Sequence, residues 1–433
     1  MNARAQFLMR GALLTLLVSA TVLQRFGFGV GEFSVTPALI AIYLLVAVAV
    51  WCGALAISRT RLLLYFGLVV IGAASAVLNE HRASFPSLLL LVVMYFPFVF
   101  VLNPHSLAED DAGWTMDRFL GLSFVCACCG VAQFFAQFVI HGEWLFDFTT
   151  LLPAGIRHNG VFNTVIPIGS FYKSNGFFFL EPSGFSLLMA LGLICESVSA
   201  KRPLRMAAYA LALLVTYSGT GILALLIGAS YPLGRKTVLR LGVIGLAGAL
   251  IYAVFDDALN LSFTLGRLGE FNSDRSSGYI RYIAPGRLLA ELFASDPWSA
   301  WVGHGPGTVF RTLREYEFHD PTWAKLLFEY GGLGFGAAFL LFLVMLRRPG
   351  IPIQVRAVLF WAWLIMGGHL LSPEQNFLTL ALVGLMPLGL GSCSTDSEAD
   401  EPSSLPAALS ETSGLMALTV ATQSFRDAGG ESG

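Results

Sequence analysis

Long uninterrupted apolar runs are the feature that most constrains how this chain can fold. The run from Pro37 to Ile57, PALIAIYLLVAVAVWCGALAI, carries no charged side chain. About 20 apolar residues cross the hydrocarbon core of a bilayer as a helix, in which the backbone N–H and C=O groups satisfy one another. Membrane β-strands instead alternate apolar and polar residues over short segments. The pattern therefore predicts membrane-spanning helices.

Similar runs recur along the chain and predict an all-α integral membrane protein with about twelve transmembrane helices. The stretch from Met206 to Tyr231 is too long for one span and contains TYSGTG at Thr216–Gly221. We therefore expect two short or tilted helices there. The expected spans lie near residues 7–23, 37–57, 62–78, 86–102, 118–140, 177–197, 204–217, 219–232, 238–255, 323–346, 353–371 and 374–391.

The composition also favours a lipid environment and argues against a nucleic-acid partner. Of the 433 residues, 55% are hydrophobic and 12% are charged, whereas roughly a quarter of an average soluble domain is charged. The formal net charge of -2 provides no general field for a polyanion. We expect residues 1–391 to form one membrane domain. Residues 392–433, rich in small and acidic residues, should be a disordered cytoplasmic tail.

Basic residues in the short loops predict the orientation in the membrane. Such residues collect on the cytoplasmic side, and the basic residues named at the end of this paragraph all fall on one side of the expected spans. An even number of spans puts both termini there as well, so the smaller loop 141–176 and the larger loop 256–322 should face the periplasm. The basic residues concerned are Arg59, Arg61, Lys201, Arg202, Arg205, Arg235, Lys236, Arg240, Arg347, Arg348 and Arg356.

No convincing metal or disulfide pattern is visible in the sequence. The 6 cysteines lie in apolar runs or in the tail, where packing is the simpler explanation. Asp256 and Asp257 are adjacent, which suits a helix exit better than a cation site. We expect neither a metal nor a cofactor.

The densest polar segment is Gly303–Gly336, GHGPGTVFRTLREYEFHDPTWAKLLFEYGGLGFG, which leads into an apolar run. Pro321 favours the first turn of a helix, so His319 and Asp320 are expected at the outer mouth of that span. A neutral histidine there could accept a proton from an attacking hydroxyl. A cap or an interfacial histidine is the alternative. His304 competes with His319, although a histidine in a glycine-rich turn often only supports the local backbone.

Glu181 is the other ionisable residue in a conspicuous position. It lies in FFFLEPSG near the outer end of an expected span, where a charge is costly unless it has a partner or a function. It could bind a substrate hydroxyl or pair with an arginine of the larger loop. The alternative is a side chain that reaches the interface.

Four segments together resemble the superfamily of O-antigen ligases, O-antigen and exopolysaccharide polymerases, and protein O-oligosaccharyltransferases. They occur in the order found in that superfamily. The segments are SNGFFFLEPSGFS at Ser174–Ser186, TYSGTGILALL at Thr216–Leu226, SSGYIRYIAPGRLL at Ser276–Leu289, and Gly303–Gly336.

The resemblance implies roles for particular residues. His319 matches the histidine that ends the large periplasmic loop, and Glu329, with Gly331 and Gly334, matches the acidic residue and glycines that follow it. Arg281 resembles the arginine that precedes a Gly-x-Gly segment.

Other residues are rivals or depart from the pattern of the superfamily. Arg275 and Arg287 compete with Arg281 for binding a diphosphate, and Arg157 and Lys173 of the smaller loop are further candidates. Lys173 stands where an arginine is common, and Asp320 stands where ligases often have asparagine.

The implied reaction is glycosyl transfer from an undecaprenyl-diphosphate-linked glycan to an acceptor hydroxyl at the periplasmic face of a bacterial inner membrane. Arginines would replace a divalent metal, because the guanidinium group binds phosphate oxygens bidentately. HDPTWAKLLFEYGGLG and YSGTG favour a polymerase of exopolysaccharide or O-antigen repeat units. The alternatives are an O-antigen ligase acting on lipid A core, a protein O-oligosaccharyltransferase, and, from another class, a polysaccharide transporter or flippase. Other polysaccharide assembly proteins are candidate partners.

Overall fold

The computed structural model describes most of the chain before residue 386, and residues 1–392 form one unit by their contacts. The expected tail, the aspartates Asp256 and Asp257 and the candidate Arg275 lie outside the described residues. The described residues are 3–30, 33–103, 109–158, 160, 162–199, 201–232, 234, 239, 242–243, 245–248, 250, 252–254, 277–294, 297–311, 317–347 and 350–385.

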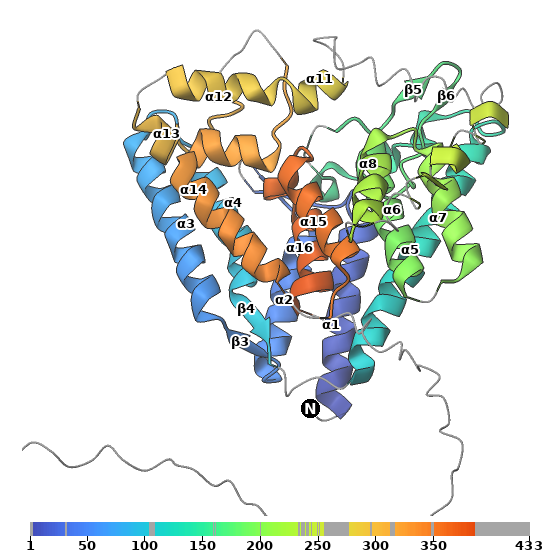
Figure 1. The fold of residues 1–433 in the computed structure, drawn as a ribbon, viewed down its shortest axis with the longest axis horizontal. Coiled ribbons are helices and arrows are strands. Elements are labelled where there is room, and N and C mark those ends of the chain that lie inside the picture. The colour runs from blue at the N-terminus through green and yellow to red at the C-terminus, as the bar shows by residue number, and fades with distance from the viewer. Residues whose placement is uncertain are drawn as a thin grey trace, which may run out of the picture. The chain divides into compact units, whose positions relative to one another are not determined.

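The first part of the chain forms helices in the order that the apolar runs predict (Figure 1). TYSGTG separates two short helices, since α7 ends at Val215 and α8 begins at Gly219. The bounds are α1 Ala3–Thr21, α2 Pro37–Trp51, α3 Arg59–Leu78, α4 Phe85–Tyr95, α5 Glu109–Ala136, α6 Pro182–Val198, α7 Pro203–Val215 and α8 Gly219–Ser230. Short 3-10 helices cover Phe96–Val99, Glu143–Leu145, Phe148–Leu151 and Ala154–Ile156.

The larger loop is partly helical, and three further helices follow it. The bounds are α11 Ser277–Tyr282, α12 Pro285–Ala294, α13 Ser299–Val302, α14 Thr322–Leu346, α15 Ile353–Ile365 and α16 Pro373–Thr379. A 3-10 helix at His369–Leu371 precedes α16, and a π-helix at Leu380–Leu385 continues it.

Short strand pairs are the departure from an all-α architecture. In the described residues they form three antiparallel two-stranded pairs, in which the strands satisfy one another's backbone groups. The pairs are β1 Phe28–Val30 with β2 Phe33–Val35, β3 Leu55–Ile57 with β4 Phe100–Leu102, and β5 Pro167–Ile168 with β6 Phe171–Tyr172.

Three described helices are long and apolar enough to cross a bilayer, judged by length and composition: Arg59–Leu78, Gly113–Ala136 and Thr322–Leu346. Shorter apolar helices of 10–17 residues, among them α2, α6 and α15, accompany them. The protein is thus a largely helical, membrane-type bundle. The total of about twelve spans stays a prediction.

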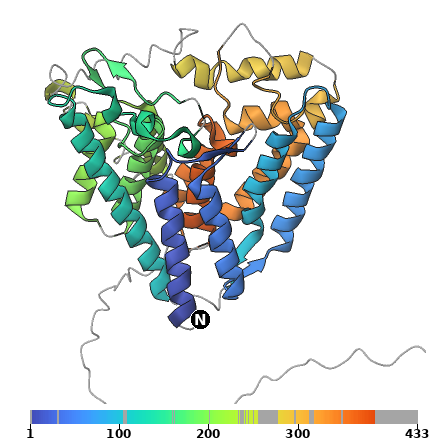
Figure 2. The ribbon, with the colours of Figure 1, turned by 180° about the vertical axis from the view of Figure 1, so that it is seen from behind.

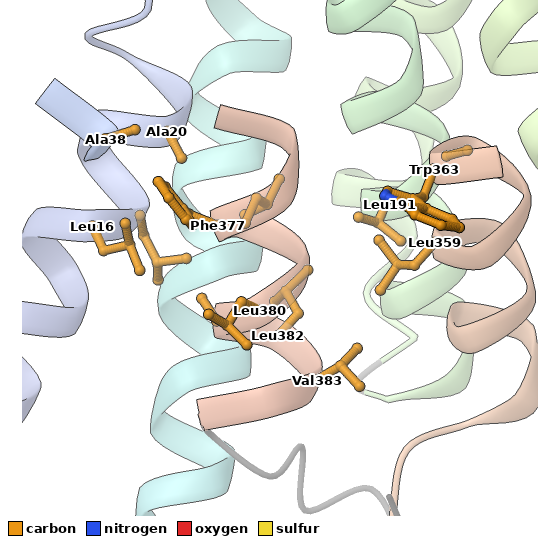
Figure 3. Packing of buried hydrophobic residues seen from close by; sticks show 14 of the residues in the cluster. Leu16, Ala20, Ala38, Leu191, Leu359, Trp363, Phe377, Leu380, Leu382 and Val383 are labelled. Atoms are coloured by element: carbon orange, nitrogen blue, oxygen red, sulfur yellow. The ribbon is translucent and has the colours of Figure 1, made fainter. Parts of the chain in front are cut away.

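The core of the bundle is built around the last helices of the described chain. Phe377 of α16 lies against Leu16 and Ala20 of α1 (Figure 3). On the other side of the core, Trp363 of α15 stacks on Phe342 of α14 with a ring-centroid distance of 4.2 Å. Phe377 thus joins α16 to α1, and Trp363 joins α15 to α14.

The two ends of the bundle carry different structures. α11–α13 and β5–β6 lie at one end, called here the loop end, and the N-terminus and β3–β4 lie at the opposite end (Figures 1 and 2). α6 begins at the loop end, beside Glu181, and runs away from it. The basic loop around Lys201 therefore lies at the N-terminal end.

α14 breaks at Gly331, and the GHGPG segment packs into the break. Gly331 has φ 65° and Gly303 has φ 78°. A Cβ atom at either glycine would overlap the backbone of the opposite segment, which is why both positions require glycine. The backbone N–H of His304 donates to Phe328 O at 2.9 Å, and that of Gly305 donates to Glu329 O at 3.1 Å. The loop thus satisfies carbonyls that the broken helix leaves open.

Candidate active site at the loop end

Residues from all four segments of the resemblance meet at the loop end. Glu181 is the N-cap residue of α6, where Pro182 opens the helix, and Ser218 holds the same position before α8. Arg281 lies in the last turn of α11, and His319 lies just before α14. Segments distant in the sequence therefore come together because each contributes a helix end to the same end of the bundle.

Two cavities open at this point and share one wall. The outer cavity has a volume of about 690 Å³ and reaches Lys173 and Glu317. The inner cavity has a volume of about 280 Å³ and is lined by residues including Asp320 and Glu374. The shared wall consists of Glu181, Ser183, Arg281 and His319.

The backbone around His319 is fixed on both sides. The His319 N–H donates to Ile280 O at 3.0 Å, which ties the residue to α11 beside Arg281. The next residues pair with the segment after α15, where the Gly368 N–H donates to Asp320 O at 3.2 Å. A Cβ atom on Gly367 would lie 3.1 Å from the Cβ of His319. The small residue at that position lets the strand-like segment approach the histidine closely.

The environment of His319 favours the neutral imidazole. Burial lowers the pKa of His319 below its ordinary value of 6.5, and the Arg281 guanidinium lowers it further. The carboxylates of Glu181 and Asp320 act in the opposite direction. A histidine that is neutral at working pH has a free ring nitrogen and can accept a proton.

Glu181 is held in place by hydrogen bonds from its own segment and from the smaller loop. The hydroxyl of Ser183 donates to its Oε2 at 2.8 Å, and the backbone N–H of Asn163 donates to its Oε1 at 3.4 Å. The carboxylate therefore faces the shared wall in a fixed orientation, ready to accept a further hydrogen bond.

Arg281 and Lys173 supply positive charge to the outer cavity. Arg281 Nη1 donates to Thr220 Oγ1 at 3.4 Å, which orients the guanidinium from α8. Lys173 is buried, and its backbone N–H donates to Ile166 O at 3.0 Å. Two cations that line one cavity match the needs of a diphosphate.

A buried polar network anchors the segment that carries Lys173. Ser174 Oγ donates to Gln133 Oε1 at 2.8 Å, and Gln133 Nε2 donates to Asn175 Oδ1 at 2.9 Å. Asn175 Nδ2 in turn donates to Phe146 O at 2.8 Å. The smaller loop is thereby fixed on α5.

Asp320 is held by an ion pair with Lys325, one turn into α14. The Lys325 Nζ lies 2.8 Å from Asp320 Oδ2, and both side chains are largely buried, at 9% and 13% exposure. Lys325 also lies 5.1 Å from the centre of the Phe310 ring. The pair keeps a charged carboxylate in the inner cavity beside His319.

The other sequence candidates lie away from the two cavities. Arg287 lies over the ring of Tyr279, 5.5 Å from its centre. Arg157 is exposed and pairs through its backbone with Phe26. His304 packs on Phe328.

Glu329 is also remote from the cavities. It is fully buried, with Oε1 accepting a hydrogen bond from the Val309 N–H at 3.4 Å. This bond supports the loop that packs into the break of α14.

The structure adds cavity residues that the sequence candidates did not include. The last apolar run supplies Glu374 and Gln375 to the inner cavity, and Gln24 joins them from the end of α1. An ionisable residue within an apolar run is itself a signal of function. Glu374, in the segment SPEQN, carried that signal.

No cluster of three or more His, Cys, Asp or Glu side chains suited to a metal ion occurs in the described part of the chain. The polar groups at the shared wall are instead a histidine, an arginine, a carboxylate and a hydroxyl. Such a set can move a proton and bind phosphate oxygens.

Comparison with known proteins identifies the family. No curated protein sequence matches the chain. A family model described as WcaD colanic acid polymerase matches residues 13–314, well over half of the 433 residues. The match includes the segments that carry Lys173, Glu181 and Arg281 and ends just before His319. The chain belongs to the WcaD colanic acid polymerase family, a family of polysaccharide polymerases.

Proposed function

We propose that this protein polymerises oligosaccharide repeat units carried on undecaprenyl diphosphate, at the periplasmic face of the inner membrane. The observation that carries the proposal is the shared wall, where a neutral histidine, an arginine and a fixed carboxylate separate two cavities. A polymerase needs such a place, because it must bring the end of one glycan to the linkage of another. Family membership supports the same reaction class.

The proposed reaction is the displacement of a lipid diphosphate by a sugar hydroxyl. The acceptor oxygen attacks the anomeric carbon, so that a C–O bond to the acceptor forms and the bond from the anomeric carbon to the phosphate oxygen breaks. His319 takes the hydroxyl proton as general base. The diphosphate leaves with its electron pair, and Arg281 and Lys173 stabilise the charge that develops on it.

Glu181 has a positioning part in this scheme. Its carboxylate accepts hydrogen bonds from Ser183 and Asn163, and it raises the pKa of His319 by electrostatic attraction. Because Glu181 and His319 line the same wall, the carboxylate can hold a substrate hydroxyl next to the base. No redox step is involved, and the proposal requires neither a metal nor a cofactor.

Chain lengthening by the purified protein tests the proposal. The protein in detergent would receive undecaprenyl-diphosphate-linked repeat units with EDTA present, and the products would be separated by length. We expect a ladder of products, reduced about 100-fold or more in His319→Ala, because general base catalysis contributes about that much. Transfer that occurs only after lipid A core is added would instead indicate a ligase. A ladder that disappears with EDTA would contradict metal independence.

A further inference from the structure

The inner and outer cavities differ in the groups that line them. Beyond the shared wall, the inner cavity is lined by hydroxyl-binding groups that include Gln24, Ser372, Glu374 and Gln375. Among the described residues of its lining, Arg281 at the shared wall is the one arginine or lysine. The outer cavity adds Lys173 to Arg281 and is more than twice as large. The cations thus favour a phosphate on the outer side, and the inner side suits an uncharged sugar.

Glu374 is an unusual group for the inner end of such a cavity. Its side chain belongs to a residue that is only 5% exposed. Oε2 accepts a hydrogen bond from the Ser372 hydroxyl at 3.3 Å, whereas Oε1 meets no donor of suitable geometry among the described residues. The Thr36 hydroxyl interacts with this carboxyl, although the two do not meet full hydrogen-bond geometry. A buried carboxyl oxygen with so weak a partner can gain a better hydrogen bond from a ligand.

The volumes of the two cavities indicate which one takes the donor sugar and which one takes the acceptor sugar. The inner volume of about 280 Å³ is at the lower end of the roughly 300–1,000 Å³ of small-ligand sites. It can take the end of a glycan but not a continuing chain. The donor sugar continues in two directions, into its own chain and into the diphosphate, so it requires the larger cavity. The acceptor hydroxyl lies at a chain end, which fits the smaller one.

We propose that the inner cavity is the subsite for the terminal sugar of the acceptor glycan, and that Glu374 selects this sugar by accepting a hydrogen bond from one of its hydroxyls. The proposal rests on the proposed polymerase function and specifies the side on which the acceptor binds. Gln24 and Gln375 complete the set of hydroxyl-binding groups. The terminal sugar of the acceptor then lies in the inner cavity, and its attacking hydroxyl faces His319 at the shared wall.

The proposal can be tested with two substrates, one that acts only as donor and one that acts only as acceptor. The donor would be a lipid-diphosphate-linked repeat unit whose terminal-sugar hydroxyls are methylated, so that it cannot accept. The acceptor would be the same repeat unit as a methyl glycoside, which cannot donate. A single transfer then yields one product, and a KM can be measured for each substrate.

Glu374→Gln should raise the KM for the acceptor roughly tenfold, because one carboxyl oxygen is replaced by an NH2 group that cannot accept the hydrogen bond of the sugar hydroxyl. The KM for the donor should change less than about twofold, since no donor contact is removed. Equal changes in both KM values, or no change in either, would overturn the subsite. A wild-type protein without any transfer would contradict the proposed polymerase function, and the subsite with it.

Matched variants separate recognition from folding. Glu196→Gln removes another buried carboxylate, near the far end of α6, where Glu196 Oε1 lies 3.3 Å from Arg202 Nε. It should leave both KM values unchanged.

Gly184→Val tests the same cavity without touching Glu374. An added Cβ at Gly184 lies 3.7 Å from Gln375 Nε2, so the larger side chain narrows the inner cavity. It should also raise the acceptor KM selectively. If Glu374→Gln does not accumulate in the membrane, Gly184→Val decides the question. An unchanged acceptor KM in Gly184→Val would count against the subsite.

Discussion

His319 and the charges around it determine how the candidate site responds to pH. The neutral imidazole is the form that can accept a proton, and burial together with Arg281 favours that form. The titration of His319 should therefore limit the reaction at low pH.

The transfer rate should fall as the pH falls through the pKa of His319. Because that pKa is lowered, the midpoint of the loss should lie below 6.5, with full activity above it, where the base is unprotonated. A pH profile of kcat/KM for the chain-lengthening reaction measures the midpoint. A loss of activity centred above pH 6.5 would contradict the role of His319 as a buried base.

Arg281→Lys should reduce transfer roughly tenfold to a hundredfold although the charge is kept. Lysine provides a point charge and cannot bind two phosphate oxygens in one plane. Arg287→Lys is the comparison, because Arg287 lies over Tyr279 and lines neither cavity. Turnover of both variants, normalised to protein in the membrane, decides between the two arginines. Greater loss in Arg287→Lys would reverse the assignment.

At the scale of elements, the broken helix α14 and the GHGPG segment form one structural unit. His319 and Asp320 directly precede the first part of α14, and the second part continues through the bundle after the break. Gly303 and Gly331 make the backbone contact between the two segments. These two glycines line neither cavity and shape the site only through the backbone packing.

Gly331→Ala should destabilise the protein by about 1–3 kcal/mol or more, because φ 65° is unfavourable for alanine and its Cβ would overlap the Trp301 backbone. Gly336→Ala lies in the same helix with nothing within 4 Å of the added Cβ, so it should be neutral or nearly so. The melting temperatures of the two variants in detergent, measured from the onset of aggregation on heating, provide the comparison. Equal melting temperatures would show that the close packing is not needed.

At the scale of the whole molecule, the polar site and the basic short loops lie at opposite ends. The loop end carries the candidate active site, and the N-terminal end carries Arg59 and Lys201 at the connections to α3 and α7. The positive-inside rule then predicts that the N-terminal end faces the cytoplasm. This orientation is the one that a reaction on exported lipid-linked glycans requires.

Cysteine labelling of whole cells tests the orientation. In a cysteine-free background, Glu143→Cys, at an exposed position of the smaller loop, should react with an impermeant maleimide once the outer membrane is opened. Lys201→Cys, exposed between α6 and α7, should react only after the inner membrane is also disrupted. The opposite pattern would show that the protein has the inverse orientation, with the site at the cytoplasmic face.

The sequence by itself determined the helical membrane class, the polysaccharide polymerase resemblance and the main candidates. Uninterrupted apolar runs require helices in lipid, and TYSGTG marked the boundary between α7 and α8 correctly because glycine and serine interrupt a helix. His319 and Glu181 could be chosen because ionisable residues at the ends of apolar runs are rare and costly, and Arg281 could be chosen because it resembles an arginine of the superfamily.

Only the tertiary structure decided which candidates come together. Arg287 remained a rival of Arg281 by sequence, but the structure places Arg287 over Tyr279 and Arg281 next to Thr220. Glu374 joined the site because α16 packs against α1 in the core, which places Ser372, Glu374 and Gln375 in the lining of the inner cavity. Such contacts join residues far apart in the chain, and local sequence patterns do not encode which helix ends meet in space.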